Sequence, residues 1–279
     1  MSTTLLDRAL RAWHWLVAGP VLIAIAPAWA YAQTNSAVDD IAKYRQLLAD
    51  GNPAELWEAR GEGLWKTPRG PNKVALSGCD LGKGPGIVKG AYVELPRYFS
   101  DVGKVMDVEQ RLAWCMVKLQ GFTEAEATAN HFGQGEKQSQ MEALVAYIAG
   151  ESRGMKIAAK AAHPEEARMY AAGKQIFFYR GGAYDFSCAT CHSGDKQRIR
   201  LQELPNLLVP AEAQKAYATW PAYRVSQGEV RTMQHRLYDC FRQQRFPVAG
   251  YDSDMITALT LFLAKNAEGG TFDAPAIKR

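Results

Sequence analysis

The sequence predicts an all-α protein made of two related halves. Two segments have helical hydrophobic periodicity: 164–179, which begins with a proline and two glutamates, and 254–264. Residues 111–115 and 236–240 share the pattern R-L-x-x-C. Further along each half, A-L-x-x-Y-I-A at 143–149 resembles A-L-x-x-F-L-A at 258–264. The two similarities follow in the same order, which indicates an internal repeat.

Composition agrees with a globular protein of this size. The chain has 279 residues, of which 47% are hydrophobic and 22% charged, so two domains with proper cores are possible. A disulfide-stapled miniprotein, a disordered tail and a coiled coil are excluded. The formal charge of +4 is too small to indicate nucleic-acid binding. The number of cysteines is odd: 79, 115, 188, 191 and 240.

The first 32 residues have the features of a secretory signal peptide. Arg8 and Arg11 precede an apolar stretch over 13–27, and the sequence 30–32 is a small-x-small cleavage motif. A membrane anchor is the weaker alternative, because the stretch is shorter than about 18 residues and is broken by prolines. We expect cleavage after Ala32 and a periplasmic protein that is not membrane-embedded. Disulfides persist in that compartment.

The strongest motif is Cys188-Ala189-Thr190-Cys191-His192. A Cys-x-x-Cys-His sequence attaches c-type haem: both thiols bind one porphyrin, and the imidazole becomes an axial ligand of the iron. The helix over 164–179, with Gly173 and Phe177, suits the first helix of a cytochrome c. The helix over 254–264 suits the last. A thioredoxin-like pair and half a zinc site are alternatives, and the adjacent histidine and the export signal count against both.

Together the repeat and the motif predict tandem cytochrome c-like domains. We expect a haem-less domain over 33–153 and a haem-binding domain over 154–279, divided where glycine and proline interrupt the helical pattern. The first half has Cys79 in a position like that of Cys191, but it lacks the other cysteine and the histidine. It therefore cannot attach haem in this way.

The repeat also suggests a role for Cys79 and Cys115. Both would line a vestigial haem pocket, where they could form a disulfide in an exported protein. Two buried free thiols are the alternative.

The second axial ligand of the iron has several candidates. Those within range of His192 are Met233, His235, Cys240 and Met255. With the other four cysteines assigned in pairs, Cys240 is left over, so it is an intermolecular bridge, a reactive thiol or a thiolate ligand. Arg236 lies one turn earlier if this segment is helical, where it would lower the thiol pKa and could bind an anion. Three nearby cations are either solvated or part of this site: Arg231, Arg242 and Arg245.

These residues resemble those of the SoxA family, the larger subunits of the SoxAX cytochromes of periplasmic sulfur oxidation. The resemblance covers nearly the whole mature chain. Its specific features are the doubled cytochrome domain, the Arg236-x-x-x-Cys240 spacing and the preceding His235. Many members carry a second haem in the first domain. This chain resembles the monohaem subgroup, in which two cysteines form a disulfide at the lost site.

The resemblance implies an L-cysteine S-thiosulfotransferase with one haem c. Thiosulfate would be joined oxidatively to a cysteine of the carrier SoxYZ, and two electrons would leave through haem to the partner SoxX and a small acceptor cytochrome c. It implies Cys188 and Cys191 as haem attachments and His192 as proximal ligand. Cys240 would be the distal ligand and reactive sulfur, often a persulfide, and Arg236 the substrate-binding cation.

Three other functions remain open. A plain electron-transfer cytochrome would use Met233 as the distal ligand and would not need Cys240. A thiosulfate dehydrogenase forming tetrathionate also uses cysteine-ligated haem, but ordinarily has two haem motifs on one chain. A purely structural subunit would not need a reactive thiol. Candidates for the surface that docks SoxX, or simply for a solvated face, are Lys196, Arg198 and Arg200.

Overall fold

The computed structural model describes residues 51–133, 138–199, 202–247 and 249–278, and the single positions 39 and 43. The predicted signal peptide, 1–32, lies outside the described residues. Gly51–Arg279 form one compact unit, and the description below concerns that unit. Within the described residues, no helix has both the length and the apolar character that a membrane span requires.

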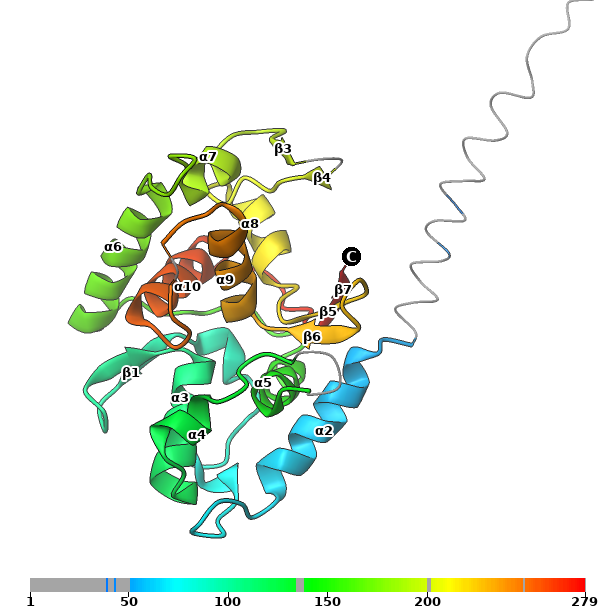
Figure 1. The fold of residues 1–279 in the computed structure, drawn as a ribbon, viewed down its shortest axis with the longest axis vertical. Helices are drawn as coiled ribbons and strands as arrows, with labels where there is room; N and C mark the ends of the chain where they lie inside the picture. The colour runs from blue at the N-terminus through cyan, green and yellow to red at the C-terminus, as the bar shows by residue number, and fades with distance from the viewer. Residues whose placement is uncertain are drawn as a thin grey trace, which may run out of the picture. The chain divides into compact units, whose positions relative to one another are not determined.

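The unit is mostly helical, as the sequence predicts (Figure 1). Its helices are α2 (Ala54–Lys66), α3 (Val108–Cys115), α4 (Glu124–Thr128), α5 (Gln140–Gly150), α6 (Pro164–Phe178), α7 (Cys188–His192), α8 (Pro210–Tyr217), α9 (Met233–Gln243) and α10 (Asp254–Asn266). Its strands are β1 (Arg97–Phe99), β2 (Lys104–Met106), β3 (Arg198–Ile199), β4 (Gln202–Glu203), β5 (Ala222–Arg224), β6 (Glu229–Arg231) and β7 (Ala276–Lys278).

Each half contains one pair of long helices that cross closely. In the first half α2 packs on α5, and in the second α6 packs on α10. A glycine lies at each crossing: Gly61 meets the backbone of Ala143, and Gly173 meets the backbone of Ala258. Any larger residue would separate the helices, so the crossing explains both glycines. The same contact in both halves supports the internal repeat.

The two helices predicted in the second half are present. Pro164 stands in the first turn of α6, and the side chains of His163 and Glu166 form a capping box that satisfies its first amides. α6 ends at Phe178, one residue before the predicted end. α10 continues two residues beyond the predicted end, and every residue from Ile256 to Ala264 is buried.

A short hairpin precedes a helix in each half, and the sequence analysis did not predict these strands. β1–β2 leads into α3, and β5–β6 leads into α9. A cis-proline precedes both hairpins, at Leu95–Pro96 and Trp220–Pro221. Strands of three residues are too short to show an alternating pattern. The C-terminal strand β7 pairs in parallel with β5, which makes the second sheet three-stranded.

The two halves share one hydrophobic core. They also meet through polar contacts: the Glu166 carboxylate at the start of α6 accepts a hydrogen bond from the amide of Tyr98, and the Tyr98 ring stacks on His163 at 3.8 Å. The connecting segment after α5 is held by backbone hydrogen bonds, such as that from Ile157 to Gly270. The domain boundary at 153/154 remains a prediction.

Candidate functional site

The helix α7 presents the Cys-x-x-Cys-His residues on a single turn. Ser187 caps this turn, because its hydroxyl accepts a hydrogen bond from the amide of Thr190 at 3.1 Å. Cys188 and Cys191 are therefore separated by one turn of helix, which suits attachment of both to one porphyrin. Burial raises the pKa of the Cys188 thiol to about 12, so this thiol is protonated at neutral pH.

His192 is oriented for metal binding. Its Nδ1 lies 3.0 Å from the carbonyl oxygen of Pro205, which can only accept a hydrogen bond, so Nδ1 carries the proton and Nε2 has a free lone pair. Burial lowers the pKa of the imidazole, and the neighbouring Arg236 charge lowers it further. A neutral imidazole whose other nitrogen donates to a carbonyl is the usual form of a histidine ligand.

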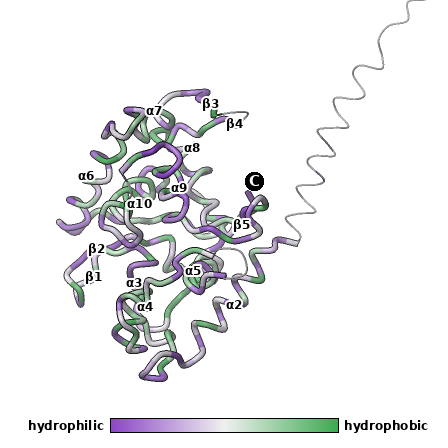
Figure 2. The backbone as a smooth tube through the Cα atoms, viewed as in Figure 1, coloured by the Kyte–Doolittle hydropathy of each residue, from purple (hydrophilic) through white to green (hydrophobic). Residues whose placement is uncertain are grey.

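Cys240 lies on α9, near the other two thiols. Its charge raises the pKa of Cys188, and the Cys191 charge raises that of Cys240 in turn. α9 is largely hydrophilic (Figure 2) and begins at Thr232, whose hydroxyl caps the helix. The structure therefore brings Cys240 to the Cys188–His192 motif, from which it is far removed in the sequence.

This donor set suits a c-type haem. Cys188 and Cys191 would hold the porphyrin, and His192 would supply one ligand of the iron. The thiol of Cys240 would be the candidate for the second ligand. Of the alternative ligands, Met233 lines a small cavity between the halves with Tyr92 and Glu109. His235 instead packs its ring against Phe132 at 4.4 Å. Within the described residues, no group of three or more His, Cys, Asp or Glu side chains has the geometry of a metal site.

Arg236 lies one helical turn before Cys240, as predicted for a helical segment. Its side chain is 33% exposed, forms a 3.7 Å ion pair with Asp239, and lies 6.0 Å from the ring centroid of Trp220. Its charge lowers the Cys240 pKa, but burial raises that pKa more, so the net direction is upward. The predicted lowering by the Arg236 guanidinium is therefore present, but desolvation of the Cys240 thiol outweighs it.

The other cations of this segment have separate roles. Arg231 is not solvated: it is buried and forms 2.9 Å ion pairs with Glu142 and Glu229. Arg242 binds Asp239 at the surface. Arg245 lies over the ring of Tyr184. Burial lowers the pKa of His235 to about 4, so His235 adds no positive charge at neutral pH.

Sequence reasoning missed three residues beside Arg236. They are Trp220, Arg224 and Lys278, which come from the segment before β5, from β5 and from β7. A recess of about 180 Å³, including space open to solvent, is lined by Trp220, Arg224, Gln227, Arg231, His235, Arg236 and Asp239. The position of Arg224 in the second hairpin could have been found by extending the repeat upstream. No sequence signal pointed to Lys278.

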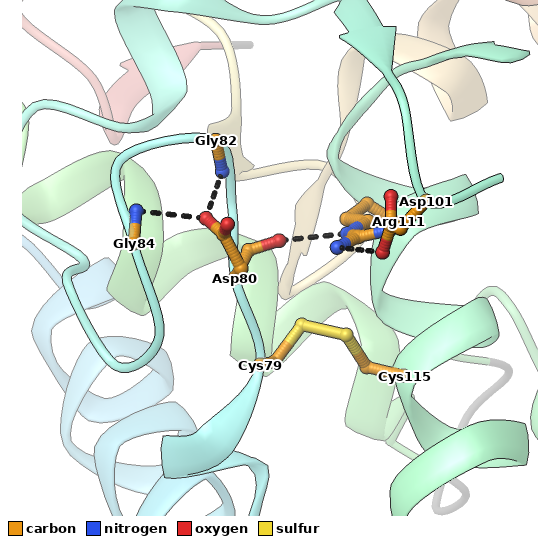
Figure 3. Close-up of a disulfide and its surroundings, with 7 residues drawn as sticks. All are labelled: Cys79, Asp80, Gly82, Gly84, Asp101, Arg111 and Cys115. Atoms are coloured by element: carbon orange, nitrogen blue, oxygen red, sulfur yellow. Dashed lines mark hydrogen bonds and ion pairs between the residues drawn. A yellow bond between two sulfur atoms is a disulfide. The ribbon is translucent and has the colours of Figure 1, made fainter. Parts of the chain in front are cut away.

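In the first half, Cys79 and Cys115 form a disulfide, with their Cα atoms 5.8 Å apart (Figure 3). This is the pairing that the sequence analysis favoured over two free thiols. Both residues are fully buried. The bond joins the segment before Asp80 to the end of α3, and Asp80 follows Cys79 as His192 follows Cys191. No imidazole is therefore available at this position.

Arg111, the counterpart of Arg236 in the repeat, is enclosed in that first half. Its guanidinium forms a bidentate pair with Asp101 and donates to the carbonyl oxygen of Asp80 at 2.7 Å (Figure 3). It also lies 4.2 Å from the ring centroid of Phe99 and 4.3 Å from that of Trp114. The Arg111 guanidinium is thus engaged by hydrogen bonds and aromatic rings of the first half, which indicates a structural role.

Comparisons with known proteins agree with this geometry. A family model described as the SoxA/TsdA cytochrome c domain matches residues 60–157 and 172–272, one segment in each half. The chain is 51% identical to the L-cysteine S-thiosulfotransferase subunit SoxA of Hydrogenophilus thermoluteolus, over 92% of this chain and 94% of that protein. It is 31% identical to the subunit of the same name from Hydrogenobacter thermophilus, over 90% of this chain and 93% of the relative.

A solved structure is also similar. The crystal structure of SoxXA from P. pantotrophus superimposes with a TM-score of 0.69 at 25% identity, covering 85% of this chain and 84% of the matched chain. The two-part match and the helical architecture establish tandem cytochrome c-like domains. The chain belongs to the SoxA family.

Proposed function

We propose that this chain is the haem-binding subunit of an L-cysteine S-thiosulfotransferase. Its activity would be to join thiosulfate to a cysteine of a SoxYZ carrier protein. The name of its 51% identical relative, L-cysteine S-thiosulfotransferase subunit SoxA, supports the transfer of thiosulfate to a cysteine. The observation that carries the proposal is the placement of Cys240 and Arg236 on one α9 turn beside the Cys188–Cys191 pair.

The overall reaction forms one sulfur–sulfur bond. The sulfane sulfur of thiosulfate bonds to the carrier cysteine, the carrier thiol loses its proton, and two electrons are released. When bound, the haem supplies the electron acceptor beside the reacting sulfur. We propose that the electrons pass on to a SoxX subunit and a small cytochrome c. The similarity to a SoxXA complex supports such a partner.

The protein's own residues bind and position the substrate. Arg236 offers a guanidinium to the thiosulfate dianion, which a planar fork of donors binds well. Cys240, as a thiol or as a persulfide that reaches one sulfur further, would bond first to the sulfane sulfur of thiosulfate, with loss of its proton and two electrons. The carrier thiolate would then attack that sulfane sulfur, and the sulfur of Cys240 would leave as the thiolate. Cys188, Cys191 and His192 hold one haem c, and we propose that the protein works in the periplasm after cleavage behind Ala32.

Replacing Cys240 tests this function. In the complex with its haem, SoxX partner and carrier, Cys240→Ala should lose nearly all thiosulfate conjugation to the carrier. Met255→Leu on α10, which removes a different sulfur, should retain it. Full activity of Cys240→Ala would refute the proposal, and tetrathionate formation from thiosulfate alone would instead indicate a thiosulfate dehydrogenase.

Two physical measurements address the ligands directly. Near-infrared magnetic circular dichroism distinguishes thiolate from methionine ligation, and we expect the thiolate form. Intact mass should correspond to one haem, one disulfide and an extra sulfur atom on Cys240. Two haems, or none, would contradict the proposed site.

A further inference from the structure

Two cations from different parts of the fold meet at one indole ring. The Lys278 ammonium lies 5.6 Å from the centroid of Trp220, and the Arg236 guanidinium lies 6.0 Å from it. The face of an indole attracts cations, so Trp220, which is buried, fixes the positions of both. Arg236 comes from α9, whereas Lys278 is brought here by the C-terminal strand β7.

A third cation is paired directly with Lys278 in the sheet. Arg224 and Lys278 are opposite each other where β5 and β7 run in parallel. Like charges on adjacent strands repel each other, so an anion bound beside this pair would be stabilised by both. Neither side chain forms an ion pair or a hydrogen bond with another described residue, and the pKa of each is lowered first by burial and then by neighbouring cations.

The charges around the recess leave a positive excess. Asp239 is the one carboxylate among its lining residues, and it is shared, because it accepts a 2.7 Å hydrogen bond from Arg242 as well as pairing with Arg236. The positive charge of Arg231 is already matched by its two buried glutamates. The positive charge that remains unmatched is therefore that of Arg224 in the recess and of Lys278 beside Trp220, while Arg236 shares Asp239 with Arg242.

The hairpin of the first half has a different residue at the position of Arg224. Phe99 pairs with Lys104 in the first hairpin as Arg224 pairs with Glu229 in the second. Phe99 covers the buried Arg111, while in the second half an arginine stands at that position and Arg236 remains partly exposed. The substitution exchanges an apolar cover for a further positive charge.

We propose that Arg224 and Lys278 form, together with Arg236, an oxyanion subsite that holds the sulfonate group of thiosulfate. The inference rests on the proposed function and names the part of the site that binds the non-reacting end of the substrate. Arg236 and Cys240 are about 6 Å apart along the helix axis. Thiosulfate held by its sulfonate group can thus direct its sulfane sulfur toward Cys240.

Conservative replacements of the two newly assigned residues test the subsite in the assembled complex. Lys278→Gln and Arg224→Gln should each raise the KM for thiosulfate about tenfold, the size expected for loss of one charge-assisted hydrogen bond, with little change in kcat. Lys278→Arg should restore most of the affinity. Lys118→Gln removes the same charge from an exposed position in the first half and should leave KM unchanged.

Sulfate binding gives a readout that does not depend on turnover. Sulfate resembles the sulfonate end and cannot react, so calorimetry on the haem-loaded complex at constant ionic strength should show binding to the parent protein and about tenfold weaker binding to Lys278→Gln. If the parent complex is inactive but sulfate affinity falls as expected, the function is wrong and the subsite stands. If KM and sulfate affinity are unchanged in both variants, the subsite is refuted whatever the activity.

Discussion

Asp252 is a half-buried carboxyl group at an unfavourable position. Burial raises its pKa to about 7, the charges of Asp107, Asp254 and Glu124 act in the same direction, and Lys104 opposes them. Its Oδ1 has no hydrogen-bond partner. The residue also has a φ of 62°, a left-handed conformation that asparagine adopts readily.

The pH dependence of stability follows from this shift. A carboxyl whose pKa is raised in the folded protein stabilises it below the unfolded pKa near 4, and that contribution is lost as the pH rises to about 7. Asp252→Asn should therefore be more stable than the parent at pH 8, by about 2 kcal/mol after allowance for partial solvent contact, and nearly equal to it at pH 4. Denaturant unfolding across this range measures the difference. A constant difference at every pH would show that Asp252 does not titrate in this way.

The helix crossings make a prediction at the scale of elements. A Cβ on Gly173 would collide with the backbone of Ala258 and would lie 2.9 Å from the Cβ of Phe262. Gly173→Ala should therefore force α6 away from α10 and reduce the free energy of unfolding by about 3 kcal/mol. Chemical denaturation of the haem-loaded protein measures this loss.

Gly63 on α2 is the matched control for Gly173. A Cβ there would meet nothing within 4 Å. Gly63→Ala should stabilise the protein by up to about 1 kcal/mol, since alanine favours the helix. Equal effects of the two substitutions would mean that helix propensity, and not the close crossing, determines the result.

The helices, strands and strand pairings differ in how far the sequence predicts them. Periodicity, caps and spacing predict α6 and α10, and α9 entered only as a conditional helix. The haem motif is recognisable because Cys188, Cys191 and His192 are close together in the sequence. The hairpins are too short to leave a pattern. Arg224 and Lys278 join Arg236 only because β5 and β7 pair, and contact between strands so far apart in the chain has no local signature. Arg231 was misjudged because its partner Glu142 is distant in sequence.

The two halves are joined by a buried polar network, and this determines how the whole molecule unfolds. The Asp107 carboxylate, from the first half, accepts a 2.7 Å hydrogen bond from Gln234 and a 3.3 Å hydrogen bond from Thr257, both from the second. Gln110 returns a hydrogen bond to the backbone oxygen of Asp252 at 2.9 Å. Because a large hydrophobic core also includes residues of both halves, the halves depend on each other.

We therefore expect one cooperative transition. In the haem-loaded protein, far-ultraviolet circular dichroism and haem absorbance should change at the same denaturant concentration. Gln234→Ala removes a donor from a buried carboxylate and should reduce the free energy of unfolding by about 2 kcal/mol in both signals. Gln175→Ala, at an exposed position on α6, should change neither. Separate midpoints for the two signals would show that the halves unfold independently.

The disulfide between Cys79 and Cys115 has a consequence for how the protein matures. The first half is cross-linked by atoms of its own chain, so its covalent structure is completed by an oxidant alone. With haem c held as proposed, the covalent structure of the second half would be completed by a porphyrin instead. Oxidation and haem attachment would then be two separate covalent steps in the maturation of one cooperative unit.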